Sequence, residues 1–260
     1  MGEENKILLR NEFDGIYKLT LNRPRAHNAL SYDLLLEISN ALNTIKKNKR
    51  IKVLIIDANG PSFCSGHDLK EINSKNDKES YKKLFSLCSS VMLSIIKLDI
   101  PVIASVHSTA TAAGCQLVAT CDLAIASDKA RFATPGVNIG LFCSTPMVAL
   151  SRNISKKHSM EMLLTGDLID ALTAKEYGLI NRVVPCRDLN DTVLEIAKKI
   201  LKKSSKTIAT GKKAFYEQLE LGVSEAYKFT SEIMTNNMTE YNAQEGVDAF
   251  LQKRSPVWKD

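Results

Sequence analysis

Three short apolar runs, separated by helical patterns, place the strongest constraint on how this chain can fold. The runs are VLIIDA at 53–58, PVIASVHS at 101–108 and CDLAIAS at 121–127. Unbroken apolar runs of this length are typical of strands buried on both faces of a parallel sheet. Apolar residues recur at helical spacing at 79–98, and small residues at 110–114 lead into another helix-like stretch. This order predicts βαβ units and a mostly parallel, right-handed α/β sheet.

Further patterns lie on either side of these runs. Residues 7–23 predict two strands joined at Asp14-Gly15, a strong hairpin signal, and residues 31–48 predict a helix with Ser31 as its N-cap. The sheet-forming part extends to about residue 145, and from about 146 the pattern is almost purely helical, with periodicity at 146–154, 156–165, 173–178, 189–203, 206–220 and 222–250. We predict a core domain at 1–198 and a C-terminal helical lobe at 199–260. The lobe cannot bury its apolar residues alone, so we expect it to pack across subunits.

The composition is that of an ordinary globular protein. The chain has 260 residues, of which 44% are hydrophobic, 25% charged and 6% aromatic, which argues against disorder, collagen or a repeat fibre. A core of this size folds without disulfides or a metal. The six cysteines form no CxxC pair, so we expect reduced thiols and no metal site. No apolar run is long enough to span a membrane, and the acidic, polar N-terminus predicts no signal or transit peptide.

The net charge of +6 does not by itself select a partner. Such an excess fits a phosphate-binding patch, a nucleic-acid surface or solvated lysines. Most of the basic clusters lie within helical patterns, which favours solvated helix faces. Aromatic residues are not interleaved with them, so nucleic-acid binding has little support.

Two loops that follow buried strands carry the candidate chemistry. GPSFCSGHDLK at 60–70 follows the first run, and TAAGCQ at 111–116 follows the second. Ligands of open α/β sheets bind at the carboxyl ends of the strands. Small residues let the backbone approach a ligand, so two facing N–H groups from these loops would form an oxyanion hole.

Motifs along nearly the whole chain resemble the enoyl-CoA hydratase/isomerase (crotonase) superfamily. They are NRPxxxNAL at 22–30, SFCSGHDLKE at 62–71, the loop at 110–116, CDLAIAS at 121–127, MLLTGDLIDALTAKEYGLINRVVP at 162–185 and EGVDAFLQKRSPVW at 245–258. In detail, GHDLKE, GLFCSTP and FLQKRSPVW most resemble one mitochondrial subgroup. The resemblance implies an α/β crotonase (ClpP/crotonase-like) fold, with repeated ββα units forming the sheet core and a C-terminal lobe for trimerisation. It also implies a homotrimer or a hexamer built as a dimer of trimers.

The resemblance further implies an acyl-CoA thioester as substrate, with no separate cofactor. Its carbonyl would lie between the backbone N–H groups of His67, just after Gly66, and of Ala113. The stretch His67, Asp68, Leu69 and Lys70 would line the pantetheine and thioester. Arg25 and Ala26 match a CoA-contacting loop, and Phe250 and Lys253 match residues that reach the CoA nucleotide of a neighbouring subunit. Cationic Arg25 and Lys253 suit phosphate recognition.

The departures from the family concern acid–base chemistry. Hydratases of this family use two glutamates, and the matching positions here are Gln116 and Gly136. Glutamine does not exchange a proton at neutral pH and glycine has no side chain, so the usual addition of water is expected to be weak or absent. Relatives that isomerise or dehalogenate place a carboxylate near Ser144, which is an uncharged hydroxyl here.

Several of these side chains have two interpretations. His67 is either a replacement acid or base or a side chain that points away and bonds to Asp68 or a backbone carbonyl. Gln116 is either a polar residue at a helix start or a hydrogen-bond donor that positions water or the acyl group. Phe250 and Lys253 fit both helix packing and CoA binding. The remaining thiols and imidazoles are expected to be structural or at the surface: Cys64, Cys115 and Cys143 as small buried residues, His107 as a hydrogen-bonded histidine, and His27 and His158 as surface residues.

These features favour an acyl-CoA enzyme of the hydratase/isomerase family, a lyase by resemblance, with an intact oxyanion hole and altered acid–base residues. The alternative is a non-catalytic acyl-CoA-binding or scaffolding protein. RNA binding is a third, weaker interpretation. The expected location is the mitochondrial matrix in a eukaryote or the cytoplasm in a bacterium.

Overall fold

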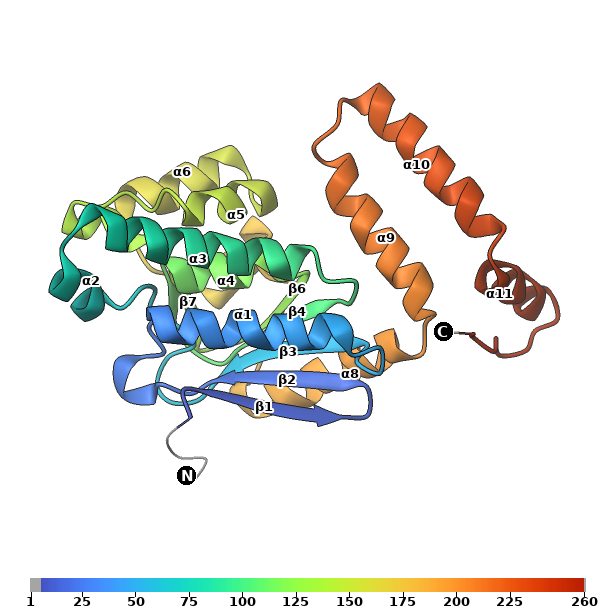
Figure 1. Ribbon diagram of the computed structural model, residues 1–260, viewed down its shortest axis with the longest axis horizontal. Coiled ribbons are helices and arrows are strands. Elements are labelled where there is room, and N and C mark those ends of the chain that lie inside the picture. Colours follow the sequence, from blue (N-terminus) through green and yellow to red (C-terminus); the bar gives the residue numbers. More distant parts are fainter. Residues whose placement is uncertain (1–5, 260) are drawn as a thin grey trace.

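The computed structural model describes residues 6–259 and confirms the predicted α/β class. Within these residues, one large sheet has the strand order β1 (Leu8–Phe13), β2 (Ile16–Leu21), β3 (Val53–Ala58), β4 (Val102–Val106), β6 (Leu123–Ser127) and β9 (Arg182–Val184) (Figure 1). β1 pairs antiparallel with β2, and every later pair is parallel. A second, smaller sheet contains β5 (Ala110–Thr111), β7 (Arg131–Ala133) and β8 (Ile169–Asp170).

The second sheet gives the fold its repeating unit. After β4 the chain enters β5 and then helix α4 (Ala113–Thr120); after β6 it enters β7 and then α5 (Pro146–Asn153). The loop after β3 extends the second sheet through isolated parallel bridges from Cys64 to Ala110 and from His67 to Leu30. The carboxyl ends of β4 and β6 therefore each lead into a short strand of the second sheet.

Local signals in the sequence explain the first elements. Asp14 and Gly15 have φ values of 47° and 79°, the left-handed geometry that a two-residue hairpin turn requires. Helix α1 (Tyr32–Lys47) begins at Ser31, whose hydroxyl accepts a hydrogen bond from the N–H of Leu34. The predicted hairpin, the N-cap and the three buried strands are confirmed.

The two faces of the large sheet are covered by different helices. Leu54 and Ile56 of β3 belong to the main apolar core with residues of α1 and α3 (Lys78–Ile96), whereas Val53 and Ile55 belong to a second core with α8 (Leu189–Leu201). Because successive strand side chains point to opposite faces, both faces of β3 must be apolar. The unbroken VLII sequence is the direct result.

Two predictions for the second half of the chain are wrong. The sheet-forming part does not end at about residue 145, because β8 and β9 lie within the mostly helical region after 146 and β9 forms the edge of the large sheet beside β6. The helix expected at 222–250 is two helices, α10 and α11, separated at Thr239 and Glu240. The helices of this half that have not yet been given are α6 (Lys156–Thr165), α7 (Ala171–Tyr177), α9 (Ser205–Gln218), α10 (Val223–Met238) and α11 (Tyr241–Leu251).

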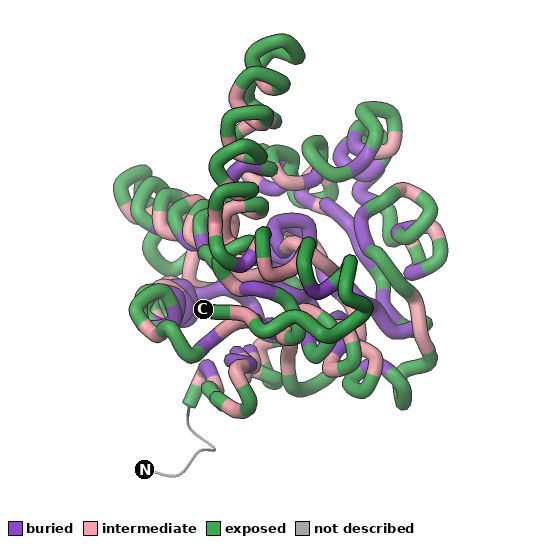
Figure 2. Tube along the Cα trace, turned by 90° about the vertical axis from the view of Figure 1, so that its right-hand side faces the viewer, coloured by how far each residue is buried: buried purple, intermediate pink, exposed green. Residues whose placement is uncertain are grey.

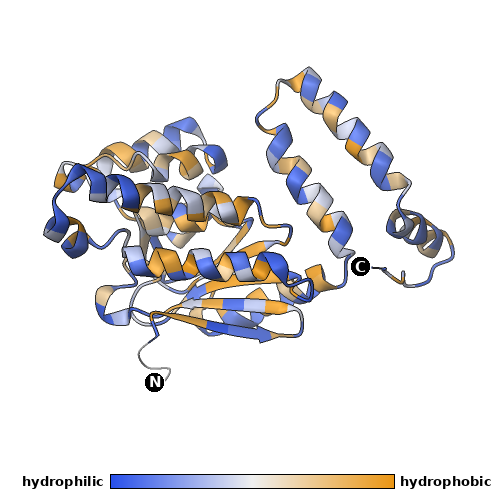
Figure 3. Ribbon diagram, in the orientation of Figure 1, coloured by the Kyte–Doolittle hydropathy of each residue, from blue (hydrophilic) through white to orange (hydrophobic). Residues whose placement is uncertain are grey.

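Helices α9 to α11 project from the body of the molecule (Figure 1). Figure 2 shows their residues mostly exposed, while buried residues concentrate in the sheet and its covering helices. Orange segments in Figure 3 show that these helices also carry hydrophobic residues. Val223, Tyr227 and Met234 of α10 are each more than 70% exposed. Among residues 6–259, no helix is long and apolar enough to cross a membrane. The division into domains at 198/199 stays a prediction.

Candidate active site

Two loops meet at the carboxyl edge of β3 and β4. The N–H of Phe63 donates to the carbonyl of Thr109 at 2.9 Å, and the N–H of Thr111 donates to the carbonyl of Cys64 at 2.9 Å. A Cβ on Gly114 would lie 2.1 Å from the Cys64 carbonyl oxygen, so only glycine allows this approach. The loops that the sequence singled out are thus held side by side through their backbones.

The backbone N–H groups of His67 and Ala113 belong to the two loops that lie side by side. The N–H of Asp68 donates to Leu30, and the Gly66 carbonyl accepts from Leu30. Since consecutive N–H groups of an extended strand point to opposite edges, the N–H of His67 faces away from Leu30. A Cβ on Gly66 would lie 3.5 Å from the Ala113 nitrogen, which places the second N–H beside this strand. Neither N–H has a hydrogen-bond partner within residues 6–259.

A strained residue directs the second N–H. Ala112, the N-cap of α4, has a φ of 50° and a ψ of −119°, a region that L-residues seldom occupy. Ala113 is the first helical residue and is fully buried, so its N–H also carries the positive end of the α4 dipole. An N–H at this position favours a negatively charged partner.

The sequence-based prediction missed two residues, Arg23 and Asn28, that hold the segment 23–30 against the loop after β3. Arg23 donates to the Asp68 carboxylate at 2.9 Å, and Asn28, fully buried with a φ of 54°, donates through Nδ2 to the carbonyls of Asn59 and Ser62. The NRPxxxNAL motif contained the signal, since asparagine tolerates left-handed backbone geometry. Both side chains tie residues 23–30 to the loop after β3.

The contacts of Asp68 stabilise the local structure. Its carboxylate accepts hydrogen bonds from the N–H groups of Lys70 and Glu71, and so caps α2 (Leu69–Lys75), and it pairs with Arg23. Although partial burial raises the pKa of Asp68, these hydrogen bonds and the Arg23 charge outweigh it and lower the pKa below the ordinary value. Asp68 is therefore ionised at neutral pH, and its carboxylate is used in contacts within the protein.

The imidazole of His67 is half-buried against α3, with both ring nitrogens shielded from solvent. Its ring packs edge-on to Phe85 with the centroids 5.2 Å apart, and neither ring nitrogen has a partner within residues 6–259. Burial lowers the pKa of His67, so the ring is neutral at neutral pH. The ring makes no hydrogen bond to Asp68, and the backbone of Leu30 is near enough to oppose the effect of burial on its pKa.

Gln116 and Gly136 have different surroundings. The Gln116 side chain is buried in α4, and its Oε1 has no partner among the described residues. At Gly136, a Cβ would lie 2.1 Å from the carbonyl oxygen of Leu141 and 2.9 Å from the sulfur of Cys143. The 140–144 segment thus fills the space that a side chain at 136 would need.

The other candidate polar groups lie outside this arrangement or are inert. Ser144 is exposed and its hydroxyl reaches the Phe142 carbonyl only at 3.4 Å. Cys64, Cys115 and Cys143 are buried as predicted, and burial raises the pKa of each thiol, for Cys64 and Cys115 to about 12. Among the described residues no cluster of three metal-binding side chains is found.

The remaining histidines are mostly where the sequence predicts them. His107 bonds to the Gly60 carbonyl at 2.8 Å, and His27 is exposed. His158 is half-buried and stacks on Tyr177 with the ring centroids 3.6 Å apart, so the prediction of a plain surface residue is wrong. The aromatic stack covers one face of its ring.

The predicted CoA contacts divide into two groups. Arg25 and Ala26 lie in a short 3-10 helix (Pro24–Ala26), near Leu69 and Lys70 at the start of α2 because Arg23 and Asp68 join the two segments. Phe250 lies in the last turn of α11 and is 83% exposed, and Lys253 lies in the turn that follows the helix. The structure therefore brings the first group to the loops that carry His67 and leaves the second group on the projecting helices.

The chain is similar to known proteins over nearly its whole length. Residues 11–260 match the family model described as enoyl-CoA hydratase/isomerase. The chain is 46% identical to the rat protein named enoyl-CoA hydratase domain-containing protein 3, mitochondrial, over 98% of this chain and 85% of that protein. The corresponding human structure has a TM-score of 0.94, with 45% identity over 97% of this chain and all of that one. An enoyl-CoA hydratase from Mycobacterium smegmatis has a TM-score of 0.96, with 47% identity over 98% and 99%.

Proposed function

The chain belongs to the enoyl-CoA hydratase/isomerase family, and on that premise we propose that it binds an acyl-CoA and stabilises its thioester enolate. The observation that carries this proposal is the pair of unpartnered N–H groups at His67 and Ala113. A thioester oxygen between them would accept two hydrogen bonds, one of them at a helix N-terminus. Such donors act most strongly on the charge that develops as the enolate forms.

Addition of water by the usual two-carboxylate route is expected to be weak or absent. Gln116 cannot take up or release a proton, and the space beside Gly136 is filled by Leu141 and Cys143. The free Oε1 of Gln116 suits a water molecule or an acyl group that donates a hydrogen bond to it. A neutral His67 imidazole can accept a proton, as a general base does. Substitution of His67 therefore tests acid–base chemistry in these loops.

A binding comparison tests the oxyanion site. Gly66→Ala would place a methyl group 2.8 Å from the Ala112 Cβ at a φ of 100°, which displaces the N–H of His67. We expect affinity for hexanoyl-CoA to fall about tenfold or more while affinity for CoA, which lacks the thioester, stays the same. Gly211→Ala is the control, because nothing lies within 4 Å of that position. An equal loss of affinity for hexanoyl-CoA and for CoA would contradict the proposal.

Product analysis tests the chemistry. A panel of 2-enoyl-CoAs and other acyl-CoAs is incubated with the protein and examined by mass spectrometry, alongside His67→Ala. We expect hydration far slower than that by a two-glutamate relative. Formation of 3-hydroxyacyl-CoA at a comparable rate would overturn this expectation, and turnover lost in His67→Ala would support a catalytic imidazole.

A second candidate function is a non-catalytic acyl-CoA-binding or scaffolding protein. The crowding at Gly136 favours it, because the matching glutamate cannot be restored by simple substitution. Binding of acyl-CoA without turnover of any panel member would support this function. Turnover of any member would exclude it.

We also propose a homotrimer or a hexamer in which α9 to α11 form the contacts. Val223, Tyr227, Met234 and Met238 lie on one face of α10 and are exposed, as is expected of a helix that packs against another subunit. A stable monomer in light scattering would contradict this. The relatives named as mitochondrial make the mitochondrial matrix the proposed location in a eukaryotic cell, and fractionation tests it.

A further inference from the structure

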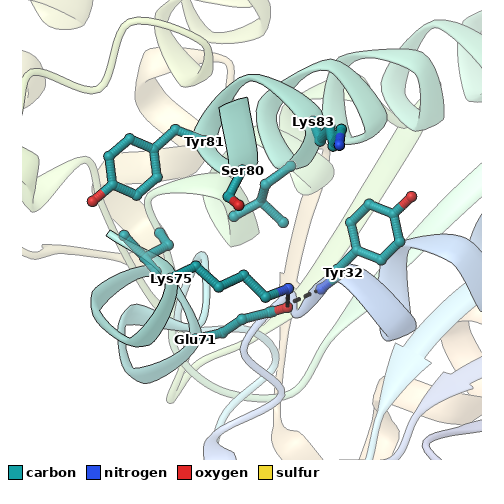
Figure 4. Close-up of a pocket in the computed structure, with 8 residues that line it drawn as sticks. Tyr32, Glu71, Lys75, Ser80, Tyr81 and Lys83 are labelled. Atoms are coloured by element: carbon teal, nitrogen blue, oxygen red, sulfur yellow. Dashed lines mark hydrogen bonds and ion pairs between the residues drawn. The ribbon is translucent and has the colours of Figure 1, made fainter. Parts of the chain in front are cut away.

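A cavity lies beside the loop that carries His67. It has a volume of about 240 Å³ and is bounded by the start of α1, by α2 and by the first turns of α3 (Figure 4). Ile72 and Leu84 supply apolar lining, and Lys75, Lys83 and Ser80 supply polar lining. Pockets for whole drug-sized ligands are generally larger, so a cavity of this volume suits the end of a chain and not a nucleotide.

Two residues relate the cavity to the loop that carries His67. Leu84 adjoins Phe85, whose ring packs against the His67 imidazole. Glu71, on the opposite wall, lies one turn after His67 and influences its pKa. The wall that contains Glu71 therefore lies within electrostatic reach of His67.

The charges of the cavity favour an anion. The Glu71 carboxylate is fully engaged, because Oε1 accepts from Lys75 Nζ at 2.9 Å and Oε2 accepts from the Tyr32 N–H at 2.9 Å. Figure 4 shows this pair on one side of the cavity and Lys83 on α3 across from it. Lys83 forms no ion pair within 4 Å with the carboxylates of residues 6–259, although its charge acts on Asp77. Two ammonium groups thus line the cavity with one, already neutralised, carboxylate.

We propose that this cavity holds the far end of the acyl group and that Lys83 pairs with a carboxylate there. The preferred substrates would be acyl-CoAs whose chain ends in a carboxylate, with the methylene groups of the chain packed on Ile72 and Leu84. The proposal rests on the proposed function, because it requires the thioester to be held at His67 and Ala113. It adds the chemical class of the acyl group.

The test compares two ligands of equal chain length. Adipoyl-CoA ends in a carboxylate and hexanoyl-CoA ends in a methyl group, and calorimetry measures their affinities for the wild type, Lys83→Met and Lys82→Met. Lys82 is the matched control, because it is an exposed lysine of α3 that does not line this cavity. We expect the wild type to bind adipoyl-CoA about fivefold tighter than hexanoyl-CoA, and Lys83→Met alone to lose this preference. Added salt should reduce the preference in the wild type.

Each other outcome has a defined meaning. Equal affinities in the wild type would overturn the inference, while a Gly66→Ala effect on hexanoyl-CoA would leave the proposed function intact. Weaker binding of CoA itself by Lys83→Met would show that this lysine contacts a phosphate of the nucleotide, which also overturns the inference. Failure of the wild type to bind either acyl-CoA would overturn the proposed function and the inference together.

Discussion

The loops after β3 and β4 and the three C-terminal helices are held in place by opposite means. The loops are fixed by backbone hydrogen bonds and by contacts so close that Gly114 admits no side chain. Helix α9 is fastened to the core chiefly through polar side chains: Lys212 donates to Asp122 at 2.6 Å and to the carbonyls of Ile95 and Ile100, and Tyr216 donates to Asp122 at 2.8 Å. Backbone contacts fix the positions of individual backbone atoms in the loops. The side-chain cluster around Asp122 fixes only the direction in which α9 leaves the core.

The largest expected effect comes from breaking this cluster. Lys212→Met leaves the mostly buried Asp122 carboxylate without its cation, so we expect the free energy of unfolding to fall by about 3 kcal/mol. Urea denaturation measures the change. Lys213→Met is the control, because that neighbouring lysine is exposed, and it should change stability by less than about 0.5 kcal/mol. Equal effects would show that the cluster does not fasten α9.

A smaller loss of stability is expected from a substitution in the loops after β3 and β4. Gly114→Ala forces a methyl group against the Cys64 carbonyl, and we expect a destabilisation of about 1–3 kcal/mol together with loss of acyl-CoA binding. Gly211→Ala in α9 should instead stabilise the protein, by up to about 1 kcal/mol. Unchanged acyl-CoA binding in Gly114→Ala would contradict the claim that this contact sets the site.

Acid should release the C-terminal segment in a defined range of pH. The side-chain hydrogen bond from Arg254, with the N–H of Val257, lowers the pKa of Glu245 to about 2. Because the folded pKa lies below the ordinary 4.5, this contribution to stability is complete above about pH 4.5 and is lost as the pH falls toward 2. Fluorescence of Trp258, the one tryptophan in the chain, reports it. Arg254→Gln should move the transition to higher pH, and an unmoved transition would disprove the assignment.

The smallest effect on the folded subunit is expected on the exposed face of α10. Tyr227→Ser and Met234→Ser remove side chains that are 72% and 71% exposed, so the far-UV circular dichroism should not change and the free energy of unfolding of a monomer should change by less than about 0.5 kcal/mol. If this face joins subunits, the same pair should lower the mass found by light scattering. An unchanged oligomer would place the contact elsewhere.

Much of the fold was predictable because its signals are local. Strands β3, β4 and β6 appear as apolar runs, the hairpin as Asp14-Gly15 and α1 as a capped periodic helix. β9 was missed because three residues carry too little periodicity and its place is set by pairing with β6, far away in the sequence. The break between α10 and α11 was missed because the apolar spacing continues across Thr239 and Glu240.

The site was predictable in its residues but not in its contacts. The motifs identified the loops around His67 and Ala113, but the sequence could not show that Asp68 is used in capping α2 and pairing with Arg23. It also could not show the cavity, since Tyr32, Glu71 and Lys83 come from three helices. Their approach depends on how α1, α2 and α3 pack.

The sequence by itself determined the family, the α/β class and the absence of carboxylates at positions 116 and 136, because these are matters of residue type and spacing. Only the tertiary structure decided which N–H groups lack partners, that the space at Gly136 is filled, and that both ring nitrogens of His67 are shielded from solvent. Each of these depends on atoms brought together from separate segments. Burial and hydrogen bonding, which set the pKa and the reactivity of a side chain, exist only once those segments have packed.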